Sequence, residues 1–107
     1  MAAIGIVTGT IETGFNGQLR TLSIRAAVEI RRNRNKSADV QPDFRIYSDD
    51  VEIGAGWIRY SELSEKSYVS LTFAAPEFGP RRIYANLGRA AGQDDDNCFA
   101  ILWNPVD

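Results

Sequence analysis

Histidine is absent from the sequence, and cysteine occurs only once, as Cys98. Without an imidazole there is no Ser-His-Asp or Cys-His arrangement and no histidine metal ligand. A single cysteine excludes an internal disulfide and multi-cysteine zinc sites, and no glycine-rich phosphate loop ending in Gly-Lys-Ser/Thr occurs. We therefore expect a protein that is not an enzyme and that needs no metal or cofactor. Cys98 is interpreted as a small core or edge residue, because the acidic 94–96 run beside it does not favour a thiolate.

Long apolar runs are also missing, and none approaches the ~20 residues of a membrane-spanning helix. The amino terminus has neither the positive flank nor the apolar stretch of a secretory signal. The chain has 107 residues, of which 24% are charged, and a formal net charge of −2. This length favours one domain over residues 1–107, without contact with a membrane. A cytoplasmic location is the default expectation.

The segment Val51 to Tyr60, VEIGAGWIRY, is the centre of the predicted fold. At a period of two, Val51, Ile53, Ala55 and Trp57 share one side, which we expect to be buried. Trp57→Ala should then lower the free energy of unfolding by about 3 to 5 kcal/mol. Gly54 and Gly56, on the other side, indicate a bulge or a close backbone approach.

Alternating apolar residues mark most of the remaining chain as strands. A hairpin is expected after 4–11, at Thr13-Gly14 and Asn16-Gly17, and surface loops are expected at 31–43 and 88–97. No segment makes an amphipathic helix of three turns. The pattern predicts an all-β, single-domain antiparallel barrel or sandwich of about seven to eight short strands. The other expected strands are 22–30, 44–48, 68–73, 82–87 and 99–103.

Acidic residues form two clusters, and neither is typical of a metal site. Asp94, Asp95 and Asp96 are consecutive, whereas a helical-hand calcium loop alternates its ligands and adds a glycine and a later glutamate. The second cluster, at 49–52, is interpreted as a solvated hairpin end.

Arginine and tyrosine residues form the candidate binding surface. If the apolar residues of the central strands face the core, the alternating positions gather all four tyrosines on the opposite side. Such a surface can stack unpaired bases or anchor a protein partner. Tyrosines that are merely good strand formers, or that form a second core layer, are the alternative. The candidate residues are Arg45, Tyr47, Tyr60, Tyr68, Arg82 and Tyr84.

A second candidate is the basic stretch 20–36, where six basic residues oppose the single Glu29, a local charge of +5. Arg31, Arg32 and Arg34 lie at its centre. A phosphate backbone would favour such a patch, whereas a solvated strand and loop would also account for it.

Several motifs together resemble the domain of unknown function 736 family. They are Pro42-Asp43-Phe44-Arg45, Gly54-Ala55-Gly56-Trp57, Tyr68-Val69-Ser70-Leu71 with Pro76, Ile83-Tyr84-Ala85-Asn86-Leu87 and Leu102-Trp103, with Gly17 and Thr21-Leu22 before them. The resemblance covers nearly the whole chain. It implies a small proteobacterial protein, often plasmid-borne, with no established catalytic activity. The RRNRN insert and Arg81-Arg82 depart from the usual pattern, so any role they have belongs to this sequence.

These observations favour a non-enzymatic binding protein. The partner that we expect is another protein, in plasmid maintenance or conjugal transfer. The alternative is a single-stranded nucleic-acid-binding protein that uses the tyrosine and arginine face. Because an aromatic patch seldom stays bare on a monomer, we also expect a homodimer.

Overall fold

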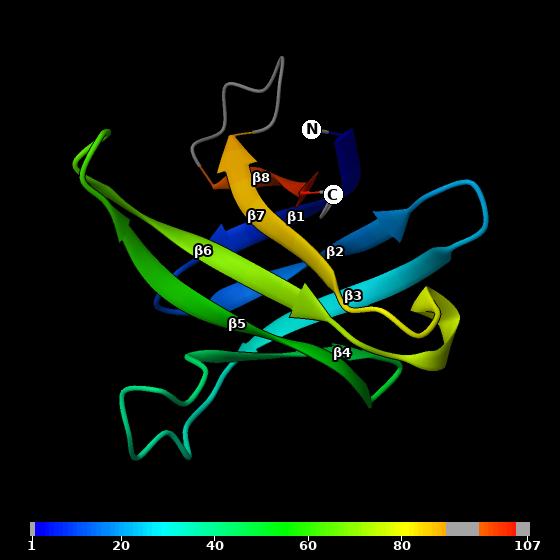
Figure 1. Cartoon of the computed structure of the whole chain (residues 1–107), viewed down its shortest axis with the longest axis horizontal. Coiled ribbons are helices and arrows are strands. Elements are labelled where there is room, and N and C mark those ends of the chain that lie inside the picture. Colours follow the sequence, from blue (N-terminus) through cyan, green and yellow to red (C-terminus); the bar gives the residue numbers. More distant parts are fainter. Residues whose placement is uncertain (1, 90–96, 105–107) are drawn as a thin grey trace.

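The alternating segments form eight antiparallel strands, each paired with the next, and the last strand pairs with the first (Figure 1). The computed structural model describes residues 2–89 and 97–104. The all-β prediction is confirmed, and the architecture is a closed barrel and not a sandwich. The elements are β1 (Ala2–Thr10), β2 (Gly14–Arg20), β3 (Arg25–Arg32), β4 (Phe44–Ser48), β5 (Val51–Ser61), β6 (Lys66–Phe73), the 3-10 turn η1 (Pro76–Phe78), β7 (Ile83–Arg89) and β8 (Cys98–Asn104). In these ranges no helix is long and apolar enough to cross a membrane.

Inward-pointing side chains from all eight strands fill the barrel. Phe44, Leu71 and Phe73 are fully buried, and Phe15 packs edge-on against Phe99 with 5.5 Å between ring centroids. The predicted inward residues of the 44–48, 68–73 and 82–87 strands therefore do form the core. An eight-stranded barrel is just wide enough for side chains to fill, and this one is filled. The main cluster is Val7, Phe15, Leu19, Val28, Ile30, Phe44, Ile46, Ile53, Val69, Leu71, Phe73, Ala85, Leu87 and Ile101.

Of the four residues expected on the buried side of the central strand, only Ile53 is buried, and Val51 at the start of the strand is 62% exposed. The β4–β5 register shifts between Ile46 and Tyr47, so Ile53 is an extra residue and β5 continues with the opposite phase. Gly54 and Gly56 consequently face the core, and Ala55 and Trp57 face outward. Trp57 is half-buried on the outer surface, where its Nε1–H donates to the Val40 carbonyl at 3.2 Å.

Position 56 faces the crowded core, and glycine fits there because a side chain would have no room. A Cβ at this position would lie 3.0 Å from Leu71 Cδ2 and 3.4 Å from Phe44 Cβ, so neighbouring large residues occupy the space. The expected bulge and close approach are both present, but on the core side of the strand.

The connections confirm some turn predictions and correct others. Asp49 and Asp50 both have positive φ, 50° and 63°, as a two-residue hairpin turn requires. The first hairpin turns at 11–13, so Asn16-Gly17 lies inside β2. Leu22, expected to begin a long inward-facing strand, lies in the β2–β3 turn and is fully exposed. The expected second loop falls largely on 90–96, outside the described residues.

The 33–43 loop is tied to the barrel, chiefly through Asp43. The Asp43 N–H donates to the Gly56 carbonyl at 2.9 Å, and its Oδ2 accepts from the Ile58 N–H at 2.8 Å. Asn33 Nδ2–H also donates to the Pro42 carbonyl at 2.9 Å. This loop therefore continues the pairing of β5 beyond the point where β4 begins.

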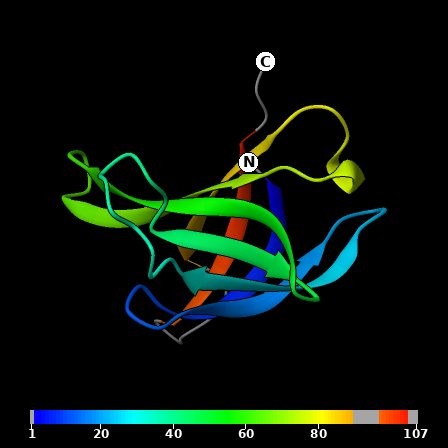
Figure 2. The ribbon, with the colours of Figure 1, turned by 90° about the horizontal axis from the view of Figure 1, so that it is seen from below.

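The barrel has two different ends and a projecting arm. The apolar end bears the β2–β3 turn and η1, and the polar end bears the β1–β2 turn and the 33–43 loop. The hairpin of β5 and β6 extends past the polar end as a two-stranded arm, because β6 pairs with β7 only over 70–73 (Figures 1 and 2).

Candidate functional site

The predicted tyrosine and arginine face does not form one surface. Tyr47, Tyr68 and Tyr84 point outward, but on different strands of a curved wall. Tyr60 lies on the same side of β5 as Ile58, opposite to the outward-facing Trp57. It is 62% exposed because it lies on the arm. The expectation that all four tyrosines share a side was therefore wrong, because it assumed an unbroken alternation and a flat sheet.

Two of the predicted arginines, Arg45 and Arg82, lie at the same site. They line a groove of about 280 Å³ on the outer face of β4, β5 and β6, whose small floor residues include Ala55 and Thr72. Trp57 forms one wall of this groove. The Arg45 guanidinium is 3.0 Å from the Glu52 carboxylate, so part of the positive charge is already compensated.

Arg31 is engaged within the molecule. Its guanidinium is 2.7 Å from Glu29 and 2.9 Å from Asp50, and it lies 4.3 Å from the Tyr47 ring centroid. The hydrogen bonds to Glu29 and then Asp50 raise the pKa of Arg31 above its usual value. Arg31 therefore ties β3 to the β4–β5 turn, and it has two carboxylates for one positive charge.

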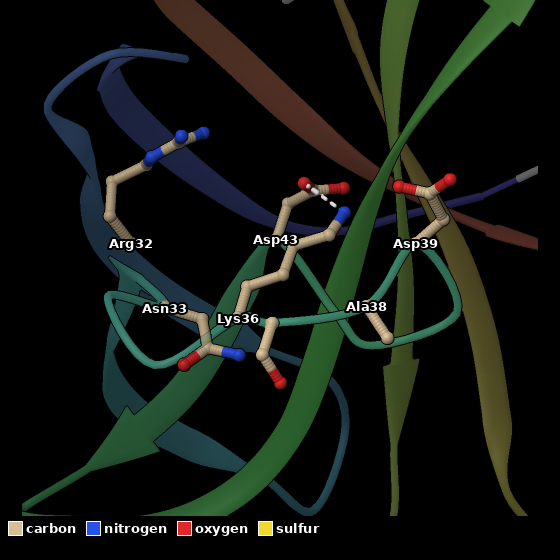
Figure 3. A pocket seen from close by; sticks show the side chains of 7 residues that line it. Arg32, Asn33, Lys36, Ala38, Asp39 and Asp43 are labelled. Carbon is tan, nitrogen blue, oxygen red and sulfur yellow. Dashed lines mark hydrogen bonds and ion pairs between the residues drawn. The ribbon is translucent and has the colours of Figure 1, made fainter.

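The polar end holds the rest of the basic stretch. A pocket of about 400 Å³ lies between Arg32 and the 33–43 loop, and Figure 3 shows the Lys36 and Asp43 side chains meeting inside it. Their charged groups are 2.7 Å apart. Arg32 donates to the Ile11 carbonyl at 3.3 Å, and the exposed Arg34 has no ion pair with a described residue.

Asp43 is held in its ionised form in this pocket. Desolvation raises its pKa, but the Ile58 N–H, the Lys36 ammonium and the nearby Arg32 charge outweigh that effect and lower the pKa below its usual value. Asp43 therefore stays ionised and neutralises Lys36.

A second polar pocket, of about 570 Å³, lies between the β1–β2 turn and β3. Arg31, Arg32 and Arg34 line it together with Glu12 and Glu29. Arg32 borders both pockets of the polar end. Each pocket thus combines cations with carboxylates, an arrangement that suits polar contacts more than tight binding of a polyanion.

The apolar end carries a pocket that the sequence did not predict, of about 550 Å³. Among its described lining residues, Thr21 and Ser23 are polar and the others have large apolar side chains. Leu22 is fully exposed beside it, and Trp103 is 39% exposed. The lining of this barrel-end pocket is Ile4, Leu19, Thr21, Leu22, Ser23, Ile24, Phe78, Ile83 and Trp103.

A structured turn holds Leu22 in this exposed position. Thr21 Oγ1 accepts from the Ile24 N–H at 3.0 Å, and the Thr21 N–H donates to the Ile24 carbonyl at 2.8 Å. On the facing side, the Phe78 ring packs 5.6 Å from Phe73, and Figure 1 shows η1 and the β2–β3 turn on the same side of the molecule. The available sequence signal was Thr21 and Ser23 flanking Leu22, because such residues favour turns.

The remaining candidates for chemistry do not form a site. Cys98 is buried, in a small cluster with Ala100 on the outer side of β8. Within 2–89 and 97–104, no group of three or more Cys, Asp or Glu residues is placed to hold a metal ion. The acidic run at 94–96 lies outside the described residues.

Comparison with known proteins places the chain in a family without naming an activity. Neither the curated proteins nor the solved structures give a match. A family model matches residues 3–106, nearly the whole chain. The protein therefore belongs to the DUF736 family, which is described as a protein of unknown function.

Proposed function

We propose that the protein is a non-enzymatic binding protein whose partner is another protein, and that the partner docks on the barrel-end pocket. One observation carries the proposal: Leu22 is fully exposed on a hydrogen-bonded turn beside a pocket lined by Phe78, Ile83 and Trp103. Contiguous exposed apolar surface on a soluble protein marks interaction sites, and aromatic anchors in pockets carry much of the binding energy of interfaces.

The filled barrel supports a surface-binding role. Leu19 lines the pocket and belongs to the core cluster, so the pocket ends at packed side chains. A small ligand could not enter the barrel without displacing the core. The setting implied by the family resemblance, plasmid maintenance or conjugal transfer, is part of this proposal.

The proposal is tested by quantitative capture of partners from a plasmid-bearing host with immobilised wild type, Leu22→Asp and Leu63→Asp. Leu63 is also fully exposed, but it lies in the β5–β6 turn beyond the polar end, so it is a matched control. We expect at least one host protein to be retained by wild type and Leu63→Asp and lost with Leu22→Asp. Identical retention on all three proteins would contradict the proposal.

A second candidate function is binding of single-stranded nucleic acid. It is supported by the Arg45, Trp57 and Arg82 groove and by the exposed Arg34 at the polar end. It ranks second because Arg31, Lys36 and Arg45 are each paired with a carboxylate. Titration of a labelled oligonucleotide at low and moderate salt tests it, since binding driven by phosphate contacts weakens steeply as salt rises. Absence of binding at low salt would exclude it.

A further inference from the structure

Four arginines lie next to lining residues of the barrel-end pocket in the sequence. Arg20 and Arg25 follow the pocket residues Leu19 and Ile24, and Arg81 and Arg82 precede the pocket residue Ile83. All four are exposed. They come from three segments, the end of β2, the start of β3 and the approach to β7, so arginines flank the lining residues of the pocket in three parts of the chain, and Arg82 also lines the groove that contains Arg45.

These arginines lack the carboxylate partners that Arg31, Lys36 and Arg45 have. Among residues 2–89 and 97–104, none of the four has a carboxylate within ion-pairing distance. Lys36 and Arg45, by contrast, each have one, and Arg31 has two. The charge at the apolar end is therefore available to a partner.

The register places two of these charges against each other. Arg20 and Arg25 are direct cross-strand partners at the end of the β2–β3 ladder. Like charges directly opposite in an antiparallel pair are destabilising, so folding does not benefit from this arrangement. Carboxylates supplied by a partner would relieve the repulsion on binding.

We infer that the partner presents an acidic segment, with a bulky apolar side chain that enters the barrel-end pocket and aspartates or glutamates that face Arg20, Arg25, Arg81 and Arg82. This inference rests on the proposed function and adds the chemistry of the partner. Complementary charge around an apolar anchor gives such an interface its specificity and speeds association.

Two other occupants are less favoured, a second copy by the charges and a lipid by the pocket. A two-fold dimer through this end would bring the four arginines against the same four of a second copy. An anionic lipid would place its acyl chain in a pocket that ends at the packed core residue Leu19. An acidic peptide avoids both problems. Its apolar side chain fills only the pocket, and its carboxylates reach several arginines.

A displayed library of short random peptides, panned on the wild-type protein, tests the inference. Each enriched peptide is synthesised, labelled and titrated into wild type, Leu22→Ser and the double variant Arg20→Gln/Arg25→Gln. The control is Arg34→Gln/Lys66→Gln, which removes the same charge from exposed positions at the polar end and on the arm. Circular dichroism melts confirm that every variant is folded.

We expect peptides with acidic residues flanking Leu, Phe or Trp. Their affinity should fall about fivefold in Arg20→Gln/Arg25→Gln, stay unchanged in the control and decrease with added salt. Enriched peptides that need Leu22 but contain no acidic residues, and that bind the arginine variant as well as wild type, would overturn the inference. The proposed docking surface would then still stand. If no enriched peptide depends on Leu22, the docking surface itself is wrong.

Vesicles of phosphatidylcholine with and without phosphatidylglycerol provide the last arm. Cosedimentation with the anionic vesicles that requires both Leu22 and Arg20, in the absence of peptide binding, would replace the acidic peptide by a membrane surface and overturn the inference. Absence of cosedimentation, together with the acidic peptides above, supports it.

Discussion

The two ends of the barrel differ in how their basic residues are paired with carboxylates. At the polar end Lys36 is paired with Asp43, and on the adjoining wall Arg31 is paired with Glu29 and Asp50. At the apolar end Arg20, Arg25, Arg81 and Arg82 have no described carboxylate partner. The conspicuous RRNRNK run is thus largely used to hold the fold, whereas scattered arginines elsewhere remain available. Density of charge in a sequence is a poor guide to charge that a partner can use.

The largest expected effect on stability comes from substitution of an aromatic side chain, and the two ends of the barrel should differ in it. Phe44→Ala should lower the free energy of unfolding by about 3 to 5 kcal/mol, because the ring is fully buried and packs 6.0 Å from Phe15. Phe78→Ala at the apolar end should cost about 1 to 2 kcal/mol, because Phe78 is half-buried at the rim. Urea unfolding measures both, and equal losses would show that the ends are packed alike.

Asp43→Asn should cost about 1 to 2 kcal/mol near neutral pH, because it removes the ion pair with Lys36 and weakens the bond from the Ile58 N–H. The folded pKa of Asp43 lies below its ordinary 3.8, so the stabilisation is present above that value and is lost as the pH falls through the folded pKa. The difference between wild type and variant, measured by urea unfolding across pH, should therefore shrink below pH 3.8. Asp39→Asn, an exposed position in the same loop, is the control and should change little. A difference that does not vary with pH would contradict the role of the charge.

Trp57→Ala should cost about 1 to 2 kcal/mol, less than the buried-core estimate, because Trp57 packs outside the barrel and makes one hydrogen bond, to Val40. The same substitution should speed proteolysis of the 33–43 loop while leaving the barrel intact. Limited proteolysis followed by mass spectrometry locates the cuts. Unchanged cleavage in the loop would show that Trp57 does not hold it.

The smallest effect on stability is expected for Tyr47→Ser/Tyr84→Ser. Both side chains lie outside the barrel, so folding should stay cooperative with a loss of about 1 kcal/mol or less. The homodimer expected from the aromatic residues predicts that this variant sediments as a monomer while the wild type does not. Analytical ultracentrifugation of both proteins decides this, and a monomeric wild type would rule the dimer out.

The sequence predicted the strands well where the alternation is unbroken. Phe44 and Ile46, or Val69 and Leu71, were correctly assigned to the core because every second residue of a regular strand faces the same side. The prediction failed at Trp57 because one extra residue, Ile53, inverts the phase, and a bulge is set by pairing with a distant strand. The prediction of an inward-facing strand residue at Leu22 was wrong for a related reason, because the apolar alternation continues through a turn.

The candidate site was less predictable than the fold. Arg45 and Arg82 were identified correctly as outward-facing neighbours, but the carboxylates that neutralise Arg31 and Lys36 could not be assigned. Asp50 lies 19 residues from Arg31, so their meeting depends on the pairing of β3 with β4 and on the β4–β5 turn. The barrel-end pocket likewise combines residues from β1, β2, η1, β7 and β8, which come together only when the first and last strands pair.

The β5–β6 arm gives this closed barrel something that closure normally removes, a pair of strand edges. Residues 66–69 of β6 pair with β5 on one side. On their other side, no described strand pairs with them. Backbone amides on such an edge exchange with solvent through local opening, whereas those of the fully laddered wall exchange only on larger unfolding. Free edges also invite pairing with other chains, and the charged side chains of Arg59, Glu62, Glu65 and Lys66 oppose this. The arm is therefore the part of the fold where protection from aggregation depends on side-chain charge and not on topology.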